Sequence, residues 1–335
     1  MNLTTLKMEL GERSYDIRIG QGSLASASSF FDLRRKVLVV TDSGVPSQYA
    51  RIIADQCSEA RIFTFPEGEE SKNLSTFENI LGAMLDFGMQ RGDAAIAVGG
   101  GVVGDITGFA ASAYMRGIDF YNVPTTLLSQ LDSSIGGKTA VDFRGVKNII
   151  GAFYQPKGVL IDTEVLKTLD SRQLAAGLAE AVKMAATSDK ELFEMIEGGL
   201  AERDIATLIT RALKIKKAVV EEDERESGIR RILNFGHTFG HGIESLGGRL
   251  HGECVALGMI PMASGSARAR IIAVLERMNL PTEFDFDIDK ALLLMKHDKK
   301  GDGDATLAVF LDDIGSCKVE RISHSDLCAH IKKNI

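Results

Sequence analysis

The sequence predicts a protein of two domains, an α/β domain built on a parallel sheet followed by a mostly α-helical domain. Three observations indicate this. Short apolar runs alternate with helical patterns in the first half, helical patterns follow one another in the second half, and 335 residues are enough for about two domains. We place the N-terminal domain at 1–162 and the C-terminal domain at 163–335.

The strands of the sheet are predicted from apolar and β-branched runs, at 36–41, 61–65, 94–98, 120–123 and 159–161. A helical pattern covers 75–87. In the second half, Asp170 and Gln173 form a capping pattern that opens the first of a series of helices. These are expected at 171–186, 191–200, 205–222, 232–243, 253–278 and 290–297, with a hairpin at 306–312 and 316–322.

Charge and composition exclude several classes of protein. The net charge of −7 disfavours a nucleic-acid surface, although it leaves room for a small anionic ligand held by local Lys and Arg. No run of about 18 apolar residues is present, so no membrane span is expected. The four cysteines are scattered and the first residues lack a secretory pattern. We therefore expect a cytoplasmic protein with reduced thiols.

A glycine cluster follows the predicted strand 94–98. Gly99, Gly101 and Gly104 match the spacing of a dinucleotide-binding fingerprint and open a helical run. Because glycine has no Cβ, a pyrophosphate can approach the backbone at the start of such a helix. The motif predicts a Rossmann-like N-terminal domain. The alternative is a tight strand–helix turn without a ligand.

A second polar stretch covers 130–148 and has the sequence QLDSSIGGKTAVDFRGVKN. It resembles the end of an ATP-binding P-loop, but Asp132 stands where that motif needs glycine, so we exclude this reading. Lys138, Lys147 and Asn148 in a loop of small residues suit phosphate oxygens. The alternative is a solvated loop.

Three histidines, His237, His241 and His251, lie within fifteen residues. The first two are four apart and share one face of a helix, and clustered imidazoles suit Zn²⁺. The alternative is a structural role for each. Spacing leaves open which carboxylate completes the site: Glu180, which shares a face of an apolar helix with Lys183, or its rivals Glu244 and Glu253. Arg230, seven residues before His237, is expected to point the same way as that histidine.

Several motifs in order together resemble the 3-dehydroquinate synthase family of sugar-phosphate cyclases. They are EGEESK, GGGVVGD, VPTTLLSQLDSSIGGKTAVD, GVKNIIGAFYQP, GLAEAVK, LNFGHTFGHGIE and HGE, between residues 67 and 300. The resemblance implies an NAD-binding domain, a helical metal-binding domain with Zn²⁺ (Co²⁺ being possible) and a homodimer. It implies conversion of 3-deoxy-D-arabino-heptulosonate 7-phosphate to 3-dehydroquinate and phosphate by NAD-dependent oxidation, phosphate elimination, reduction and aldol closure.

The resemblance also implies site residues. Metal ligands would be Glu180, His237 and His251. NAD contacts would be Asp42, Glu67, Gly68, Glu69, Glu70, Ser71, Lys72, Gly101, Val102, Val103, Gly104, Asp105, Thr125, Thr126, Lys138, Lys147, Val165, Leu166, Lys167 and Thr168. Substrate groups would be Asp132, Lys138, Asn148, Lys183, Lys216, Glu226, Arg230, Asn234, His241 and either Lys299 or Lys300. Arg116 would reach the phosphate site of the neighbouring subunit, and His241 would serve the phosphate instead of the metal.

Three other functions remain as alternatives. A metal-dependent polyol dehydrogenase would also use NAD and a histidine-rich metal site, but it would not need so many anion-binding residues. Another sugar-phosphate cyclase, making an inosose or a valiolone, would act on a substrate without a carboxylate, which Arg230 and Lys216 argue against. A non-catalytic NAD-binding regulator would show no turnover.

Overall fold

The computed structural model describes residues 3–226, 228–298 and 304–335. The chain divides into two compact units, 1–169 and 170–335. The short 3-10 helix Thr163–Thr168 lies in the first unit. Each unit is described by itself below.

The first unit is built on a sheet with the strand order β1-β2-β9-β6-β5-β3-β4. β1 pairs with β2 in an antiparallel way, and the remaining neighbours are parallel. This confirms the predicted parallel-sheet domain and adds two N-terminal strands. The strands are β1 (Leu3–Met8), β2 (Tyr15–Gly20), β3 (Lys36–Asp42), β4 (Glu59–Phe65), β5 (Ala94–Gly99), β6 (Asp119–Pro124) and β9 (Gly158–Ile161).

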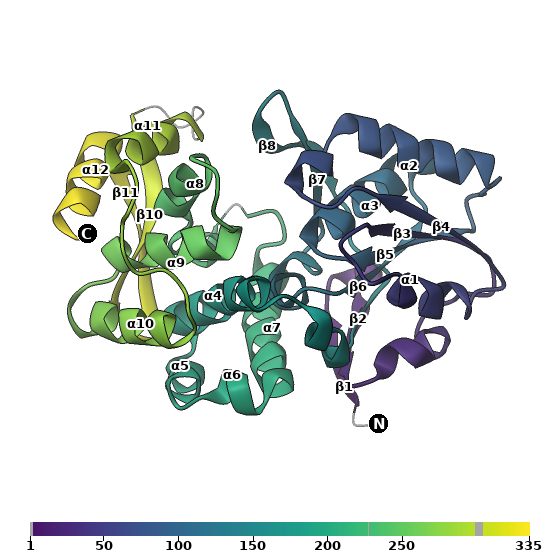
Figure 1. Ribbon diagram of the computed structural model, residues 1–335, viewed down its shortest axis with the longest axis horizontal. Helices are drawn as coiled ribbons and strands as arrows, with labels where there is room; N and C mark the ends of the chain where they lie inside the picture. The colour runs from purple at the N-terminus through teal and green to yellow at the C-terminus, as the bar shows by residue number, and fades with distance from the viewer. Residues whose placement is uncertain (1–2, 227, 299–303) are drawn as a thin grey trace. The chain divides into compact units, whose positions relative to one another are not determined.

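Both faces of this sheet are covered, as expected for parallel strands that are almost entirely apolar. Helix α1 (Ser47–Ala54) packs on one face, against a core that includes Val37 and Val39. Helices α2 (Leu74–Asp86) and α3 (Gly101–Ala113) pack on the other, against a core that includes Leu38 and Val40. Figure 1 shows α2 and α3 lying together beside the strands.

The polar stretch expected as a loop is largely a hairpin. Strand β7 (Lys138–Phe143) pairs with β8 (Val146–Phe153), and a short π-helical turn covers Ser129–Ser133. Arg144 and Gly145 join the strands with φ values of +50° and +79°. Positive φ at both central residues matches the twist of a two-residue hairpin. The loop prediction, which covered 130–148, is therefore wrong for 138–143 and 146–148.

The second unit is mostly helical. Its helices are α4 (Ser171–Ser188), α5 (Lys190–Glu197), α6 (Leu200–Arg203), α7 (Ile205–Glu222), α8 (His237–Glu244), α9 (His251–Met262), α10 (Gly265–Arg277), α11 (Ile288–Asp298) and α12 (His324–Lys333). The predicted hairpin is present as β10 (Ala305–Asp313) and β11 (Ser316–Ser323). Figure 1 shows this hairpin among the green and yellow helices.

Two long predicted helices are each broken. The pattern 232–243 splits into a 3-10 turn, Ile229–Asn234, and α8, because Gly236 has φ +77° between them. The pattern 253–278 splits at Ala263, which forms a bridge with Leu311 of β10. Arg230 and His237 therefore do not lie on one continuous helix, which was the basis for expecting them to point the same way.

Helices α4 and α9 form the core of the second unit. Residues 175–187 of α4 and 252–262 of α9 are buried throughout. Small side chains let the two helices approach closely, since a Cβ at Gly252 would collide with the backbone of Ala176. No helix in the described part of the chain is long and apolar enough to cross a membrane.

Candidate active site

In the first unit, the predicted NAD-binding residues follow the carboxyl ends of the strands. Strand β4 lies on one side of β3, whereas β5 and β6 lie on the other. The order in which strands are added to the sheet therefore reverses between β3 and β5. Open α/β sheets bind ligands outside the strand ends at such a point. Asp42 ends β3, and Gly101 starts α3 directly after β5. The strand–turn–helix context expected for the glycine cluster is therefore present.

Short contacts hold these loops together. The amide of Glu67 donates to Ser43 Oγ at 3.0 Å, and the amide of Thr125 donates to Gly99 O at 2.9 Å. Asp42 Oδ1 accepts from the amides of Gly44 and Val45, while burial raises the pKa of this carboxyl. The 165–168 segment joins the group through a 2.9 Å hydrogen bond between Tyr49 and Thr168.

Lys72 connects three of the predicted segments. Its Nζ lies 2.6 Å from Asp105 Oδ2, at the start of α3, and 2.5 Å from Asn148 Oδ1, on β8. Lys147, beside Asn148, lies 4.0 Å from Glu69. The loop 67–72, the first turn of α3 and the hairpin are thus brought together. Lys138 is exposed at the first position of β7, and Asp132 lies in the π-helical turn.

Backbone strain marks several predicted site residues. Among the described residues, the residues other than glycine that have a positive φ are Met115, Arg116, Arg144, Asn148, Glu226 and Asn279. Such conformations cost energy and concentrate at functional positions. Arg116, Asn148 and Glu226 were all expected at the site. The sequence carries no signal for this strain.

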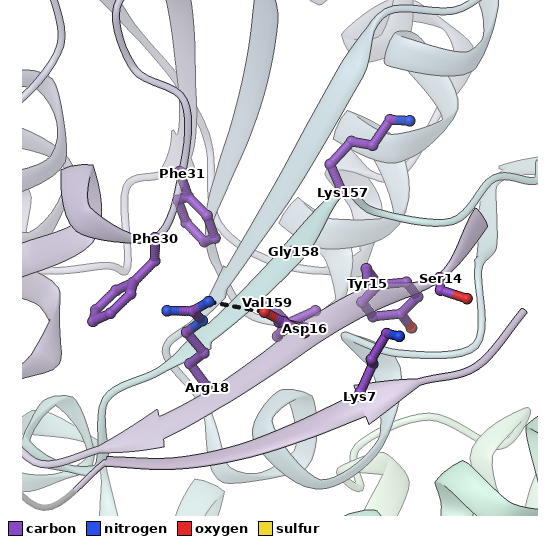
Figure 2. A pocket seen from close by; sticks show the side chains of 10 residues that line it. All are labelled: Lys7, Ser14, Tyr15, Asp16, Arg18, Phe30, Phe31, Lys157, Gly158 and Val159. Carbon is purple, nitrogen blue, oxygen red and sulfur yellow. Dashed lines mark hydrogen bonds and ion pairs between the residues drawn. The ribbon is translucent and has the colours of Figure 1, made fainter. Parts of the chain in front are cut away.

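A pocket of about 240 Å³ lies at the amino ends of β2 and β9, the strand ends opposite to those that carry the predicted NAD-binding residues (Figure 2). Its cations have acidic partners: Arg18 contacts Asp16 at 2.8 Å, and Lys157 lies 3.9 Å from Asp119. Figure 2 shows Arg18 also lying near Phe30, whose ring centre is 4.7 Å from the guanidinium carbon. The predicted NAD-binding residues do not line this pocket.

In the second unit, Glu180, His237 and His251 come together as a group whose ligand atoms lie within 4.8 Å of one another. Glu180 is fully buried on α4, while each histidine is the first residue of its helix. Nε2 of each histidine lies 3.6 Å from Glu180 Oε1. Of the carboxylates that the sequence left open, Glu180 thus lies with His237 and His251, whereas Glu244 lies with His241 and His251.

The chemistry of this group fits a divalent metal ion. Both Glu180 oxygens are buried: Oε2 is paired with Lys183, and Oε1 lies 3.6 Å from Nε2 of each histidine, which leaves room for a shared ion. Nδ1 of His237 lies 3.2 Å from the carbonyl oxygen of Phe235, which can only accept, so Nδ1 carries the hydrogen of a neutral ring. Its Nε2 then presents a lone pair toward Glu180. A carboxylate and two imidazoles are a common ligand set for catalytic zinc.

Opposing charges set the protonation of the group. Burial would raise the pKa of Glu180, but Lys183 and the two histidines hold it well below its usual value. Burial and Lys183 lower the pKa of His237 well below its usual value. For His251, burial is outweighed by hydrogen bonds to Glu180 and Glu244, which raise the pKa to about 9. The Nε2 proton of His251 is the one that a metal ion would replace.

Three predicted substrate cations are buried in this unit: Lys183, Lys216 and Arg230 are 2%, 4% and 3% exposed. Lys183 forms an ion pair with Glu180. The 3-10 turn that carries Arg230 contacts both α4 and α7, the helices of the two lysines. Buried cations require anionic or dipolar partners, and Lys183 finds one in Glu180 and Arg230 one in the carbonyl oxygen of Glu224, at 2.5 Å.

The loop before Arg230 is held by a residue that the sequence did not single out. Asp223 Oδ2 accepts from the amides of Gly228 and Arg230, at 2.6 Å and 3.1 Å. The side chain of Asn234 donates to Glu226 at 2.7 Å across the same loop. These two contacts span five and seven residues, so no local turn motif in the sequence marks Asp223.

The other histidine and the rival carboxylates take different positions. His241 groups with Glu244 and His251, and its ring centre is 5.4 Å from that of His237. Glu253 accepts from the amide of Leu250 and is bound by Arg172 at 2.6 Å and 2.8 Å. It therefore caps α9 and is not grouped with Glu180. Lys299 and Lys300 lie outside the described residues.

Solved structures share this architecture. The chain is 29% identical to 2-deoxy-scyllo-inosose synthase complexed with carbaglucose-6-phosphate, NAD⁺ and Co²⁺, with a TM-score of 0.88 over 99% of this chain and 100% of that one. It is 29% identical to the 2-epi-5-epi-valiolone synthase of Streptomyces hygroscopicus, bound to NAD⁺ and Zn²⁺, with a TM-score of 0.87 and 99% of both chains covered. A probable glycerol dehydrogenase from Sinorhizobium meliloti, 17% identical with a TM-score of 0.62 and 94% of both chains covered, shares the fold alone.

Sequence comparisons give the family. Residues 62–176 match the model of the 3-dehydroquinate synthase N-terminal domain, and residues 177–301 match that of the C-terminal domain. The chain is 42% identical to the 3-dehydroquinate synthase of Geobacter metallireducens, with 96% of both chains covered. It is 38% identical to that of Lactococcus lactis, with 98% of this chain and 99% of the relative covered. The chain therefore belongs to the 3-dehydroquinate synthase family.

Proposed function

We propose that this chain converts 3-deoxy-D-arabino-heptulosonate 7-phosphate into 3-dehydroquinate and phosphate, with NAD and a divalent metal ion as cofactors. Near full-length similarity to enzymes of that name supports this. The structural observation that supports this function most is a group of residues suited to bind a metal ion, in a unit that also contains buried cationic side chains. These residues are Glu180, His237 and His251, with Lys183, Lys216 and Arg230.

The cofactors are assigned by the fit of the residues. Glu180, His237 and His251 would hold Zn²⁺ or Co²⁺. The loops at the carboxyl ends of β3, β5 and β6 would hold NAD. Bound NAD would accept a hydride from the substrate carbon that bears a hydroxyl and later return it, and the bound metal ion would polarise the oxygen of that hydroxyl as a Lewis acid. The substrate has the composition of product plus phosphoric acid, so no oxidant is consumed.

The polypeptide would contribute mainly binding and orientation. Lys138, Asn148, Asn234 and His241 would hold the phosphate. Arg230 and Lys216 would hold the substrate carboxylate, because a buried planar guanidinium suits that group. Asp132, Glu226 and one of Lys299 or Lys300 remain proposed substrate contacts.

Phosphate release tests this function. We expect release from the heptulosonate phosphate that requires NAD, stops with a chelator and leaves no accumulated NADH. Accumulation of NADH with a simple polyol would contradict the proposal and favour a dehydrogenase. Equal release from sedoheptulose 7-phosphate, which lacks the carboxylate, would favour another cyclase and remove the assigned role of Arg230 and Lys216.

A homodimer in the cytoplasm completes the proposal. Arg116 is exposed, and both it and Met115 have positive φ, which supports a functional role for this strained turn. We propose that Arg116 reaches the phosphate site of a second copy. Sedimentation should give the mass of two chains. Mixing Arg116→Ala chains with Lys138→Ala chains should restore part of the activity only if sites are shared between copies.

A further inference from the structure

We propose that Glu244 is a positioning residue for the metal ligand His251. Glu244 is the last residue of α8, and its Oε2 lies 3.3 Å from Nδ1 of His251. Its side chain is 15% exposed. The inference rests on the metal role proposed for Glu180, His237 and His251.

The contact determines which nitrogen of His251 can bind a metal ion. An ionised carboxylate can only accept hydrogen bonds, so the nitrogen that faces Glu244 must carry a hydrogen. A neutral ring has only one such hydrogen, which leaves the lone pair on Nε2. Nε2 is the atom that lies 3.6 Å from Glu180 Oε1. Glu244 therefore turns the donor nitrogen toward the other ligands.

His237 is held by the same arrangement with a different acceptor. Its Nδ1 lies 3.2 Å from the backbone carbonyl of Phe235, and its Nε2 also lies 3.6 Å from Glu180 Oε1. Acceptors behind metal-binding imidazoles fix the tautomer and raise the basicity of the ligand. Of the two acceptors, that of His251 belongs to a side chain and can be removed by substitution.

His251 has more need of such an anchor than His237. Its side chain is 30% exposed, against 13% for His237, so packing restrains its ring less. It also follows a turn in which Gly247 and Gly248 have φ values of +83° and +82°. The hydrogen bond to Glu244 therefore restrains the orientation of the His251 ring.

A direct metal bond to Glu244 is the competing role. His241, Glu244 and His251 also form a group whose ligand atoms lie within 4.8 Å of one another. An ion bound between Glu244 and His251 would meet Nδ1, the nitrogen that lies 3.3 Å from Glu244 Oε2. A neutral ring cannot offer lone pairs on both nitrogens. The two roles therefore predict different ligand sets for Glu244 variants.

Cobalt binding by the full chain separates these roles. Co²⁺ affinity is measured by competition with a chromophoric chelator, and the ligand set is followed by the visible absorption bands of Co²⁺. We expect Glu244→Ala to weaken Co²⁺ binding about 10–100-fold. Glu244→Gln should lose less, because its amide oxygen still accepts from Nδ1. Both variants should keep the band positions of the parent. Ser245→Ala, at the residue that follows α8, should bind like the parent.

Unchanged affinity in Glu244→Ala would overturn the inference. Shifted cobalt bands in Glu244→Gln would also overturn it, because Glu244 would then be a ligand itself. Thermal unfolding of the metal-free variants checks that they are folded. If Glu244→Ala is not folded, the cobalt affinity and bands of Glu244→Gln are used to test the inference. If the parent binds no Co²⁺, or if His251→Ala binds it like the parent, the proposed metal site fails and this inference fails with it.

Discussion

Lys72 and Asp105 form a buried ion pair in which Nζ and Oδ2 are 2.6 Å apart. Lys72 is 5% exposed and also binds Asn148. Burial would lower the pKa of Lys72, but Asp105 and Glu69 outweigh burial and raise it. One lysine thus connects the loop 67–72, the start of α3 and the β7–β8 hairpin.

Removing this lysine should destabilise the first unit. Lys72→Met removes the cation that pairs with the partly buried Asp105, and breaking a buried pair costs up to about 3 kcal/mol. We expect a lower midpoint in urea unfolding followed by circular dichroism. The double variant Lys72→Met/Asp105→Leu should recover most of the loss, because no unpaired charge remains. A double variant as unstable as the single one would show that the pair is not the cause.

Lys138 should matter for turnover and not for folding. It is exposed at the first position of β7, so truncation creates no cavity. We expect Lys138→Ala to lower phosphate release by at least about 100-fold, since it removes a charge-assisted contact to the phosphate. Its unfolding temperature should match that of the parent. Lys157→Ala, an exposed lysine of the same unit, is the control, and normal release by Lys138→Ala would remove Lys138 from the site.

The sequence predicted the central strands and most helices because their patterns are local. It missed the β7–β8 hairpin because the turn is Arg144–Gly145, and arginine is an uncommon residue for positive φ. The glycines and lysines around it favoured a loop. The helix breaks at Gly236 and Ala263 have non-local causes. A Cβ at Gly236 would lie 2.7 Å from the carbonyl oxygen of Val255, and Ala263 pairs with Leu311.

The site was predictable only in part, because some of its residues are brought together by contacts between segments that are far apart in the sequence. The histidine cluster is visible as a local spacing, but Glu180 precedes His237 by 57 residues and reaches it only because α9 packs against both α4, which carries Glu180, and α8, which carries His237. Spacing alone therefore could not choose among Glu180, Glu244 and Glu253. The hydrogen bonds of Asp223 and Glu244 likewise depend on folded geometry.

Loss of His251 should remove the metal ion. His251→Ala leaves Glu180 and His237 as the remaining members of the group, and two ligands hold a divalent ion poorly. Metal analysis after desalting should give about one Zn²⁺ or Co²⁺ per chain for the parent and much less for the variant. His330→Gln, which changes a histidine bound to the carbonyl of Pro261, should keep its metal. Full retention by His251→Ala would exclude His251 as a ligand.

The start of α7, the helix that carries Lys216, should show a pH-dependent contribution to stability. Asp204 caps this helix: its Oδ1 accepts from the amide of Thr207 at 3.0 Å, and its Oδ2 accepts from the hydroxyl of Thr207 at 2.6 Å. These hydrogen bonds hold the pKa of Asp204 below its usual value. Asp204→Ala should therefore cost about 1 kcal/mol at pH 7.

This cost should shrink in acid. The folded pKa lies below the unfolded value of about 3.9, so the charged cap stabilises the fold fully above that pH. The contribution is lost as the pH falls through the folded pKa. Urea unfolding at pH 7 and pH 3 measures the difference between parent and Asp204→Ala. Asp204→Asn keeps a capping oxygen without a titrating group, so its difference from Asp204→Ala should change little with pH. A parent–alanine gap of equal size at both pH values would show that the carboxylate charge contributes nothing.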